Sequence, residues 1–503
     1  MFSLIWISIK IGTLLTIYGF AFTKLVHKSE ANWIMQRLLP ITVGLFVTGV
    51  LFPSIWLYWA LICILIPTLS RTTAEAACLY VLTVLMTPTA QLEMNLGSMY
   101  LLTFDKWLFA GIGLIIAVQI RRSRARLPVG WFDLFFVLII TLELIQARGM
   151  NVTSTLRSLF GTVVVLILPY FVVSRSLRQP SDIRRLMFTI AFAGFVLSCE
   201  AVYELRFKFL PYDLISQHLG SVVGISAYSK QRAGSLRAST SFEESTSFGL
   251  FLAIAFLAML ASHDIFKNRQ SRLIGLMVML AGLYAANARS AILSLVLGVL
   301  AYDFYRKRYG AMIVKLAGIV GLGLMALSAA QFSPRLADRL GVSGSSVDST
   351  DYRALLLRRG MEEIRKHPWT GTSSAEAKIA LADIRQGEGI IDFVNAYVFY
   401  GLTAGIGGII IMIVCFFGTA LRMLAIRKRL QKTPGLVQVG AVVFAVSLFT
   451  AVTAFTSGFG GKGSMIFYIV MAISSALGTR RAAVARPPQI RREEPAPIPV
   501  AVA

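Results

Sequence analysis

Basic residues gather in one segment, 205–245, of a chain that is otherwise dominated by apolar residues. The segment carries five basic residues against three acids: Arg206, Lys208, Lys230, Arg232 and Arg237 against Asp213, Glu243 and Glu244. A further cation, Arg289, stands between two apolar runs, where a charge is costly. Because guanidinium groups offer forked, charge-assisted donors, the pattern indicates an anion site, with phosphate as the best-fitting ligand. The alternatives are a tolerated basic loop and an arginine that reaches the membrane surface.

The elements that must position these cations are membrane helices. Of the 503 residues, 56% are hydrophobic and only 15% are charged, whereas about a quarter are charged in a soluble protein. Apolar runs of about 17 to 25 residues, each long enough to cross a bilayer, recur along the chain. A lipid-exposed backbone must satisfy its own hydrogen bonds, and the runs are continuous rather than alternating. We therefore predict an all-α polytopic membrane bundle and exclude a multi-domain soluble enzyme.

We predict about 12 to 15 spans from the apolar runs. They lie near 2–22, 38–53, 55–70, 75–90, 104–120, 131–147, 158–174, 186–204, 246–262, 273–288, 290–302, 314–331, 393–421, 436–457 and 463–479. Fifteen spans would place the N-terminus outside when the C-terminus is inside. Because that orientation is unusual, we expect one of the N-terminal assignments to be wrong.

The net charge of +24 comes mainly from five short connections between apolar runs, at 121–130, 175–185, 263–272, 303–315 and 422–432. Basic connections mark the cytoplasmic side of a membrane protein, so this charge indicates topology rather than nucleic-acid binding. The remaining connections then lie outside, at 148–157, 205–245, 332–392 and 458–462.

The outer segment 332–392 is too long to be a simple turn, and it contains nine basic and nine acidic residues. We predict a water-facing, partly helical cap between a membrane domain at 1–331 and C-terminal spans at 393–479. Its first helix should run from Tyr352 to Lys366, with Leu357, Met361 and Ile364 on its apolar stripe. A second, weaker helix should follow the capping pattern Ser373-x-x-Glu376. The proline-rich stretch 480–503 is predicted to be a disordered cytoplasmic tail.

Four stretches resemble motifs of the O-antigen ligase and polymerase superfamily. The run from Arg232 to Gly249 is similar to the family segment in which Arg and Gly precede a polar turn and an apolar helix. Ala288-Arg289-Ser290-Ala291 is similar to its Ser-Arg-Gly-type motif, and Ile364–Gly371 to its His-Pro-x-x-Gly turn. Phe393–Leu402, which contains Asn395, is similar to its His-Asn-x-x-Leu…Gly-Leu motif. The likeness extends from about residue 90 to residue 480 of the chain.

Two departures from the family pattern bear on the type of reaction. Val394 precedes Asn395 where the family usually has a histidine, and Glu244-Ser245 stands where relatives often show His-Pro. The histidine that the ligases are thought to need is therefore missing, which favours a polymerase or exopolysaccharide type over a ligase.

The resemblance implies a glycan donor carried on undecaprenyl pyrophosphate. The protein must then hold the pyrophosphate, neutralise the charge that grows on it and take a proton from the acceptor hydroxyl. Arg232, Arg237 and Arg289 suit the first two tasks. The candidates for the catalytic base are four residues expected near the outer interface: Glu243, Glu244, His367 and Asp392. Helix capping or a salt bridge with Arg237 is the alternative role of either glutamate, and ending a helix is that of His367.

We therefore predict a glycosyltransferase of the bacterial inner membrane that joins glycan from this donor to an acceptor glycan or lipid at the periplasmic face. The four cysteines lie within apolar runs, and no P-loop, sugar-nucleotide or Asp-x-Asp motif occurs, so we expect no metal and no cofactor. A transporter or flippase of lipid-linked sugars is one alternative, although it should show paired broken helices and modest outer loops. A non-catalytic partner of other polysaccharide-assembly proteins is another. The expected partners include membrane lipids and no nucleic acid.

Overall fold

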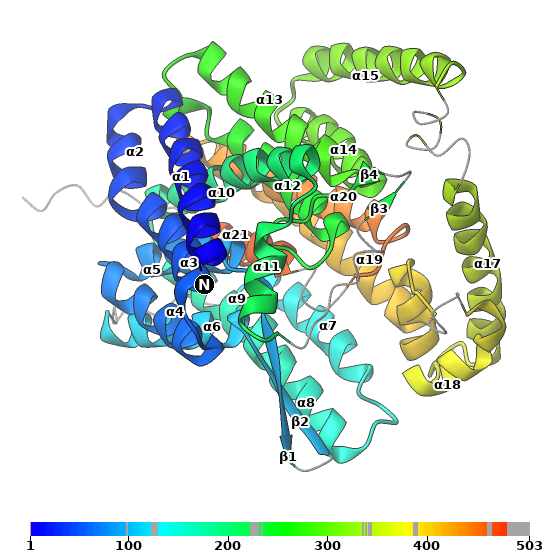
Figure 1. Ribbon diagram of the computed structural model, residues 1–503. Helices are drawn as coiled ribbons and strands as arrows, with labels where there is room; N and C mark the ends of the chain where they lie inside the picture. Colours follow the sequence, from blue (N-terminus) through cyan, green and yellow to red (C-terminus); the bar gives the residue numbers. More distant parts are fainter. Residues whose placement is uncertain are drawn as a thin grey trace, which may run out of the picture.

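Every apolar run of the sequence is helical in the computed structural model (Figure 1). The structure describes residues 2–479 apart from 97–98, 122–128, 222–230, 233–234, 334–336, 338–339, 341–344, 386–390 and 460–464, so the predicted tail at 480–503 lies outside the described residues. The four N-terminal runs are helices as well; two of them, Leu4–Leu25 and Lys28–Leu51, are long and apolar enough to cross a membrane, and Ile55–Leu69 and Thr73–Met86 are shorter apolar helices.

The helices that correspond to the apolar runs follow one another in antiparallel fashion. They are α1 (Phe2–Leu25), α2 (Lys28–Trp33) continued by η1 (Ile34–Leu38) and α3 (Leu39–Leu51), α4 (Ile55–Leu69), α5 (Thr73–Met86), α6 (Lys106–Ile120), α7 (Trp131–Ile145), α8 (Val152–Thr162) continued by η2 (Val163–Ile167) and α9 (Leu168–Ser176), α10 (Pro180–Phe207), α12 (Ser245–Ala261), α13 (Arg269–Ala286), α14 (Arg289–Tyr305), α15 (Tyr309–Ala330), α19 (Ala396–Leu430), α20 (Leu436–Thr453) and α21 (Met465–Gly478).

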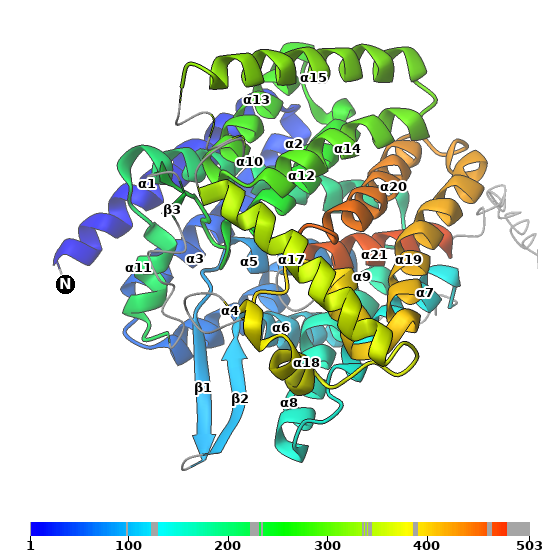
Figure 2. The ribbon, with the colours of Figure 1, turned by 90° about the vertical axis from the view of Figure 1, so that its right-hand side faces the viewer.

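Seven of the described helical stretches are long and apolar enough to cross a membrane, and five shorter apolar helices accompany them. The predicted all-α membrane bundle is thereby confirmed. Helix α10 lies at its centre, where it packs against α1, α5, α12 and α13. Helix α15 lies at the margin of the bundle in both views, with its side chains exposed along nearly its whole length (Figures 1 and 2). In a membrane these apolar side chains would face lipid.

Described residues of several predicted inner connections meet at one end of the bundle. At this end, Val26 forms an isolated β-bridge with Phe266, Arg184 pairs with Asp264, and Arg429 donates to the Leu477 carbonyl at 2.8 Å. Three of the four predicted outer connections, 205–245, 332–392 and 458–462, contribute residues to one cavity, described below. The short elements α11 (Pro211–His218), β3 (Gln231–Arg232) and β4 (Ser235–Leu236) lie in the outer segment 205–245, and η4 (His263–Ile265) lies in an inner connection.

A β-hairpin, which the sequence analysis did not predict, precedes α6. Strand β1 (Gln91–Leu96) pairs antiparallel with β2 (Met99–Asp105), and the hairpin projects from the helices in both views (Figures 1 and 2). The span predicted from residue 104 therefore starts at Lys106. Asp105 ends the hairpin and caps the helix, since its carboxylate accepts from the Trp107 and Leu108 amides.

The cap consists of α17 (Ser345–Lys366), α18 (Ser374–Ala380) and η5 (Ala382–Ile384), and α17 crosses one end of the bundle (Figure 2). The predicted capping box of Ser373 and Glu376 is present. The apolar stripe of α17 begins one residue earlier than predicted: Leu356 and Ile364 are buried in a small core of the cap, whereas Met361 is exposed. Helix α17 packs on α19, and this contact determines which face of α17 is buried. The sequence alone did not show this contact.

The turn after α17 is inserted into a break in α19. Gly405 has φ +67° and ψ −164°, which interrupts the helix. Backbone groups on both sides of the break form hydrogen bonds with the turn. Ile406 N–H donates to the Pro368 carbonyl at 2.8 Å, and the Leu402 carbonyl accepts from Thr372 N–H at 2.6 Å. Gly371, with φ +60°, lies so close that a Cβ there would be 2.6 Å from the Leu402 carbonyl oxygen. The turn therefore attaches the cap to the membrane helices.

Candidate functional site

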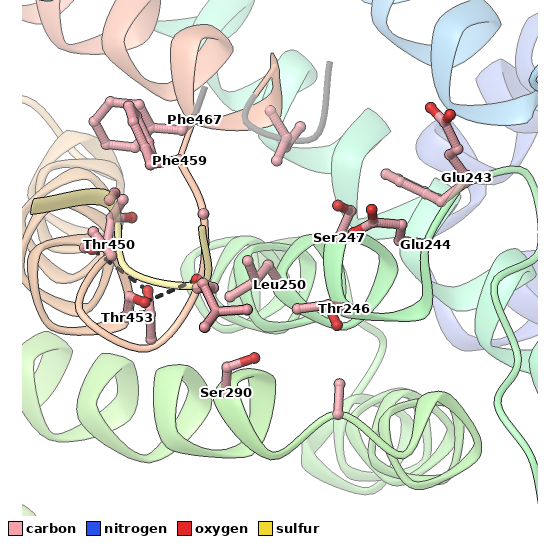
Figure 3. A pocket seen from close by; sticks show the side chains of 18 of the residues that line it. Glu243, Glu244, Thr246, Ser247, Leu250, Ser290, Thr450, Thr453, Phe459 and Phe467 are labelled. Carbon is pink, nitrogen blue, oxygen red and sulfur yellow. Dashed lines mark hydrogen bonds between the residues drawn. The ribbon is translucent and has the colours of Figure 1, made fainter. Parts of the chain in front are cut away.

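A cavity of about 1520 Å³ lies at the end of the bundle that carries the cap, and residues of α5, α6, α12, α14, α20, α21 and the cap line it. Figure 3 shows part of this lining. The cavity is lined by five of the residues that the sequence analysis selected: Arg237, Arg289, Glu243, Glu244 and Asp392. These residues are far apart in the sequence, and the fold brings them to one space.

Arg237 is held by a turn that four helices fix in place. The turn is anchored to α13 by Ala238 N–H, which donates to the Ala285 carbonyl at 3.0 Å. The fully buried Glu204 of α10 accepts from the Ser239 and Thr240 amides at 3.1 Å each. Thr240 has φ +48°, a conformation that a non-glycine residue adopts only when its surroundings impose it. Arg237 itself donates to Thr246 Oγ1 at 3.2 Å. Its backbone is therefore fixed before any ligand binds.

Contacts with α6 and α5 complete the anchoring of this turn, through Lys106 of α6 and the Leu85 carbonyl of α5. The buried Lys106 ammonium donates to the Thr87 carbonyl at 2.6 Å and to the Ser241 carbonyl at 3.1 Å. Ser241 Oγ donates to the Leu85 carbonyl. Lys106 also lines the cavity, and sequence reasoning missed it because its partners lie in remote segments. The only signal available was a charged pair, Asp105-Lys106, at the outer end of an apolar run.

Arg289 is the first residue of α14 and reaches the cavity because α14 packs closely on α12. The two helices approach at Gly249, where a Cβ would be 2.6 Å from the Cβ of Ala291. The first turns of both helices line the cavity, at Thr246 and Ser247 of α12 and at Ser290 of α14 (Figure 3). Helix N-termini carry partial positive charge, so both dipoles add to the two guanidinium groups in favouring an anion here.

Four carboxyl groups line the same cavity: that of Asp105, which caps α6, and those of Glu243, Glu244 and Asp392. Burial raises the pKa of Glu244, the neighbouring Glu243 and Asp392 carboxylates raise it further, and Arg237 opposes them. Burial also raises the pKa of Asp392, against the effect of Arg353. Glu244 occupies the N-cap position of α12, yet within the described part of the chain its side chain makes no capping hydrogen bond. A raised pKa makes a carboxylate a stronger base, so such a group facing a cavity is suited to general-base catalysis.

Two predicted residues, His367 and Asn395, do not line the cavity, and a third, Arg232, cannot be placed relative to it. His367 is exposed in the turn that enters α19 and is absent from the cavity lining; its carbonyl accepts from Gly371 N–H at 3.0 Å. Asn395 is buried as the N-cap of α19, where Oδ1 accepts from Val398 N–H at 3.1 Å. Arg232 lies in β3, and its side chain is outside the described part of the structure. For His367 and Asn395 the observed contacts are those of residues that end and begin helices.

Apolar and cap residues form the remaining walls. Leu250, Ile254, Leu293, Phe449, Ile466 and Phe467 line the cavity between α12, α14, α20 and α21. In the view of Figure 3, Glu243 and Glu244 lie on one side of the space, and Phe459 and Phe467 lie on the other. Tyr352, Arg353, Phe393 and Val394 line it from the cap and its connection to α19; sequence reasoning had selected neither Tyr352 nor Arg353.

Part of the chain matches a known protein family. Residues 274–413 match the family model described as O-antigen ligase. The matched stretch runs from within α13 to within α19, so it contains Arg289, the cap, His367, Asp392 and Asn395. Arg237 and the two glutamates lie before it. No curated protein sequence matches this chain.

Proposed function

We propose that this chain, whose residues 274–413 match the O-antigen ligase family model, is a membrane glycosyltransferase that joins glycan from an undecaprenyl-pyrophosphate donor to an acceptor glycan or lipid at the periplasmic face. The observation that carries the proposal is the convergence of Arg237, Arg289 and two helix N-termini on one cavity that also holds the carboxyl group of Glu244. Anion binding and proton acceptance are the two tasks that such a transfer requires.

The donor has two parts, a pyrophosphate and a polyprenyl chain, and each fits a different region of the cavity. The pyrophosphate binds to Arg237, Arg289 and the first turns of α12 and α14. The polyprenyl chain lies along the apolar wall formed by residues such as Leu250, Leu293 and Phe467. The sugar bonded to the pyrophosphate then lies beside Glu244.

The transfer is a single displacement. Glu244 takes the proton of an acceptor hydroxyl, and the hydroxyl oxygen forms a bond to the anomeric carbon of the donor sugar. The bond between that carbon and the pyrophosphate oxygen breaks, and Arg237 and Arg289 neutralise the charge on the departing undecaprenyl pyrophosphate. No oxidant, reductant or nucleotide is consumed.

A polymerase-type reaction fits this site better than a ligase-type reaction. Val394, where the ligases have a histidine, lines the cavity with an apolar side chain, and His367 does not line it. A flippase would also use cavity cations, but a cavity carboxyl group with a raised pKa supports proton transfer rather than transport.

Glycan analysis of a deletion strain tests the proposal. A single repeat unit in place of polymer is expected for a polymerase, and unlinked full-length polymer for a ligase. Lipid-linked units retained on the cytoplasmic side would instead support a flippase and contradict the transferase. In the complemented strain, Arg289→Lys should restore little product, because a point charge cannot replace the guanidinium fork, whereas the exposed Arg365→Lys should restore it fully.

A further inference from the structure

We infer that the cap forms a binding subsite for the sugars of the acceptor glycan, built from Arg353, Tyr352 and Asp392 at the water-facing wall of the cavity. The inference rests on the proposed function and assigns the second substrate to a particular wall. All three residues line the cavity.

The two ends of the cap meet at this wall. Tyr352 near the start of α17 bonds to the main chain at Asp392 through its hydroxyl, which donates to the Asp392 carbonyl and accepts from the Asp392 amide, at 3.0 Å each. These bonds hold Arg353, the next residue of α17, close to Asp392. The Arg353 charge lowers the pKa of Asp392, so this guanidinium and this carboxylate, two forked polar groups from opposite ends of one segment, lie near each other.

The chemistry of this wall suits a sugar. Adjacent hydroxyl groups of a sugar ring match the two oxygens of a carboxylate and the parallel donors of a guanidinium, each of which forms two hydrogen bonds at once. The Phe393 and Phe399 rings, with centroids 5.1 Å apart, line the cavity beside Asp392 and offer apolar faces for the C–H groups of a sugar ring. Trp107 of α6 lines the same cavity.

The route by which each substrate enters determines which wall of the cavity it occupies. The reacting carbon of the donor is attached to a pyrophosphate whose lipid lies in the membrane, so the donor occupies the wall formed by the membrane helices. The reacting hydroxyl of the acceptor lies on its glycan, away from the end that is attached to a lipid, so it approaches from the water-facing side, where the cap lies. Glu244 lines the same cavity, and the charges of Arg237 and Asp392 both act on its carboxyl group, so the proposed base is near residues of each subsite.

The test uses the full chain in lipid nanodiscs with two probes: undecaprenyl pyrophosphate, and lipid-linked repeat units extracted from the deletion strain. We expect Arg353→Met to lower the transfer rate by about tenfold or more while the Kd for undecaprenyl pyrophosphate stays unchanged, which also shows that the variant is folded. Arg237→Met should weaken undecaprenyl pyrophosphate binding. Arg365→Met, at an exposed arginine of the same helix, should change neither quantity.

Two results would overturn the subsite. Transfer at the wild-type rate in Arg353→Met would show that Arg353 binds no substrate. Weakened undecaprenyl pyrophosphate binding equal to that of Arg237→Met would assign Arg353 to the donor. If the wild-type chain neither binds undecaprenyl pyrophosphate nor transfers sugar, the proposed function fails, and the subsite fails with it.

Discussion

At the scale of single residues, the proposed reaction depends on the carboxyl group of Glu244 and on the charges around it. Burial and two neighbouring carboxylates raise its pKa, and Arg237 acts in the opposite direction. This set of neighbours was not predictable from the sequence, because Asp392 is far from Glu244 along the chain. The sequence did provide the residue types, since an outer segment with both arginines and glutamates is rare next to apolar runs.

Replacing Glu244 with glutamine keeps the size of the side chain and removes its basicity. We expect Glu244→Gln to lower polymer synthesis about 100-fold or more, the usual contribution of a general base, at an unchanged protein level. Glu93→Gln, at an exposed glutamate of the hairpin, is the matched control. Immunoblots and glycan gels measure protein and product. Near-normal polymer in the Glu244 variant would move the role of base to Glu243 or Asp392.

The pH dependence of transfer should report the coupling between Glu244 and Asp392. The base form of Glu244 is lost as the pH falls through its raised pKa, so activity should decline on the acid side. Asp392→Asn removes a negative charge that raises this pKa. The acid limb of the rate profile should therefore move to lower pH, whereas Asp351→Asn, at an exposed carboxyl group of α17, should leave it in place. A shift to higher pH would contradict the coupling.

At the scale of elements, the sequence predicted what depends on local composition and missed what depends on distant partners. Each apolar run became a helix, and the Ser373 capping box formed as expected. The break in α19 was not predicted, because its carbonyl and amide groups are satisfied by the turn at 368–372. The hairpin at 91–105 was not predicted, because the two long apolar runs on either side of it are the strongest pattern in this part of the sequence. Lys106 was missed because its role depends on the carbonyls of Thr87 and Ser241.

The break at Gly405 allows a direct test of how the cap is attached. A Cβ at Gly405 would be 2.5 Å from the Pro368 carbonyl oxygen, and its φ of +67° strains any other residue. We expect Gly405→Ala to destabilise the docked cap by about 1–3 kcal/mol. Gly407→Ala, where a Cβ meets nothing within 4 Å, is the control. Limited proteolysis of the purified chain should cut the cap faster in the first variant only; equal rates would refute the attachment.

At the scale of the whole molecule, the helices separate a basic end from an end that carries the cavity and the cap. We propose that the basic end faces the cytoplasm. Cysteine at the exposed Thr370 of the cap should then react with a membrane-impermeant thiol reagent in intact cells, and cysteine at the exposed Gln431 should react only after lysis. The native chain, whose four cysteines are buried or partly buried, measures the background. The opposite labelling pattern would place the cavity in the cytoplasm.

The most direct test of the central claim is transfer by the purified full-length chain in nanodiscs, supplied only with lipid-linked repeat units from the deletion strain. Glycan length and free undecaprenyl pyrophosphate would both be measured. We predict longer glycans and one undecaprenyl pyrophosphate released for each bond formed, with both products lost in Glu244→Gln. Intact lipid-linked units and no new glycosidic bond, under conditions in which the chain binds undecaprenyl pyrophosphate, would contradict the claim that this cavity is the active site of a glycosyltransferase.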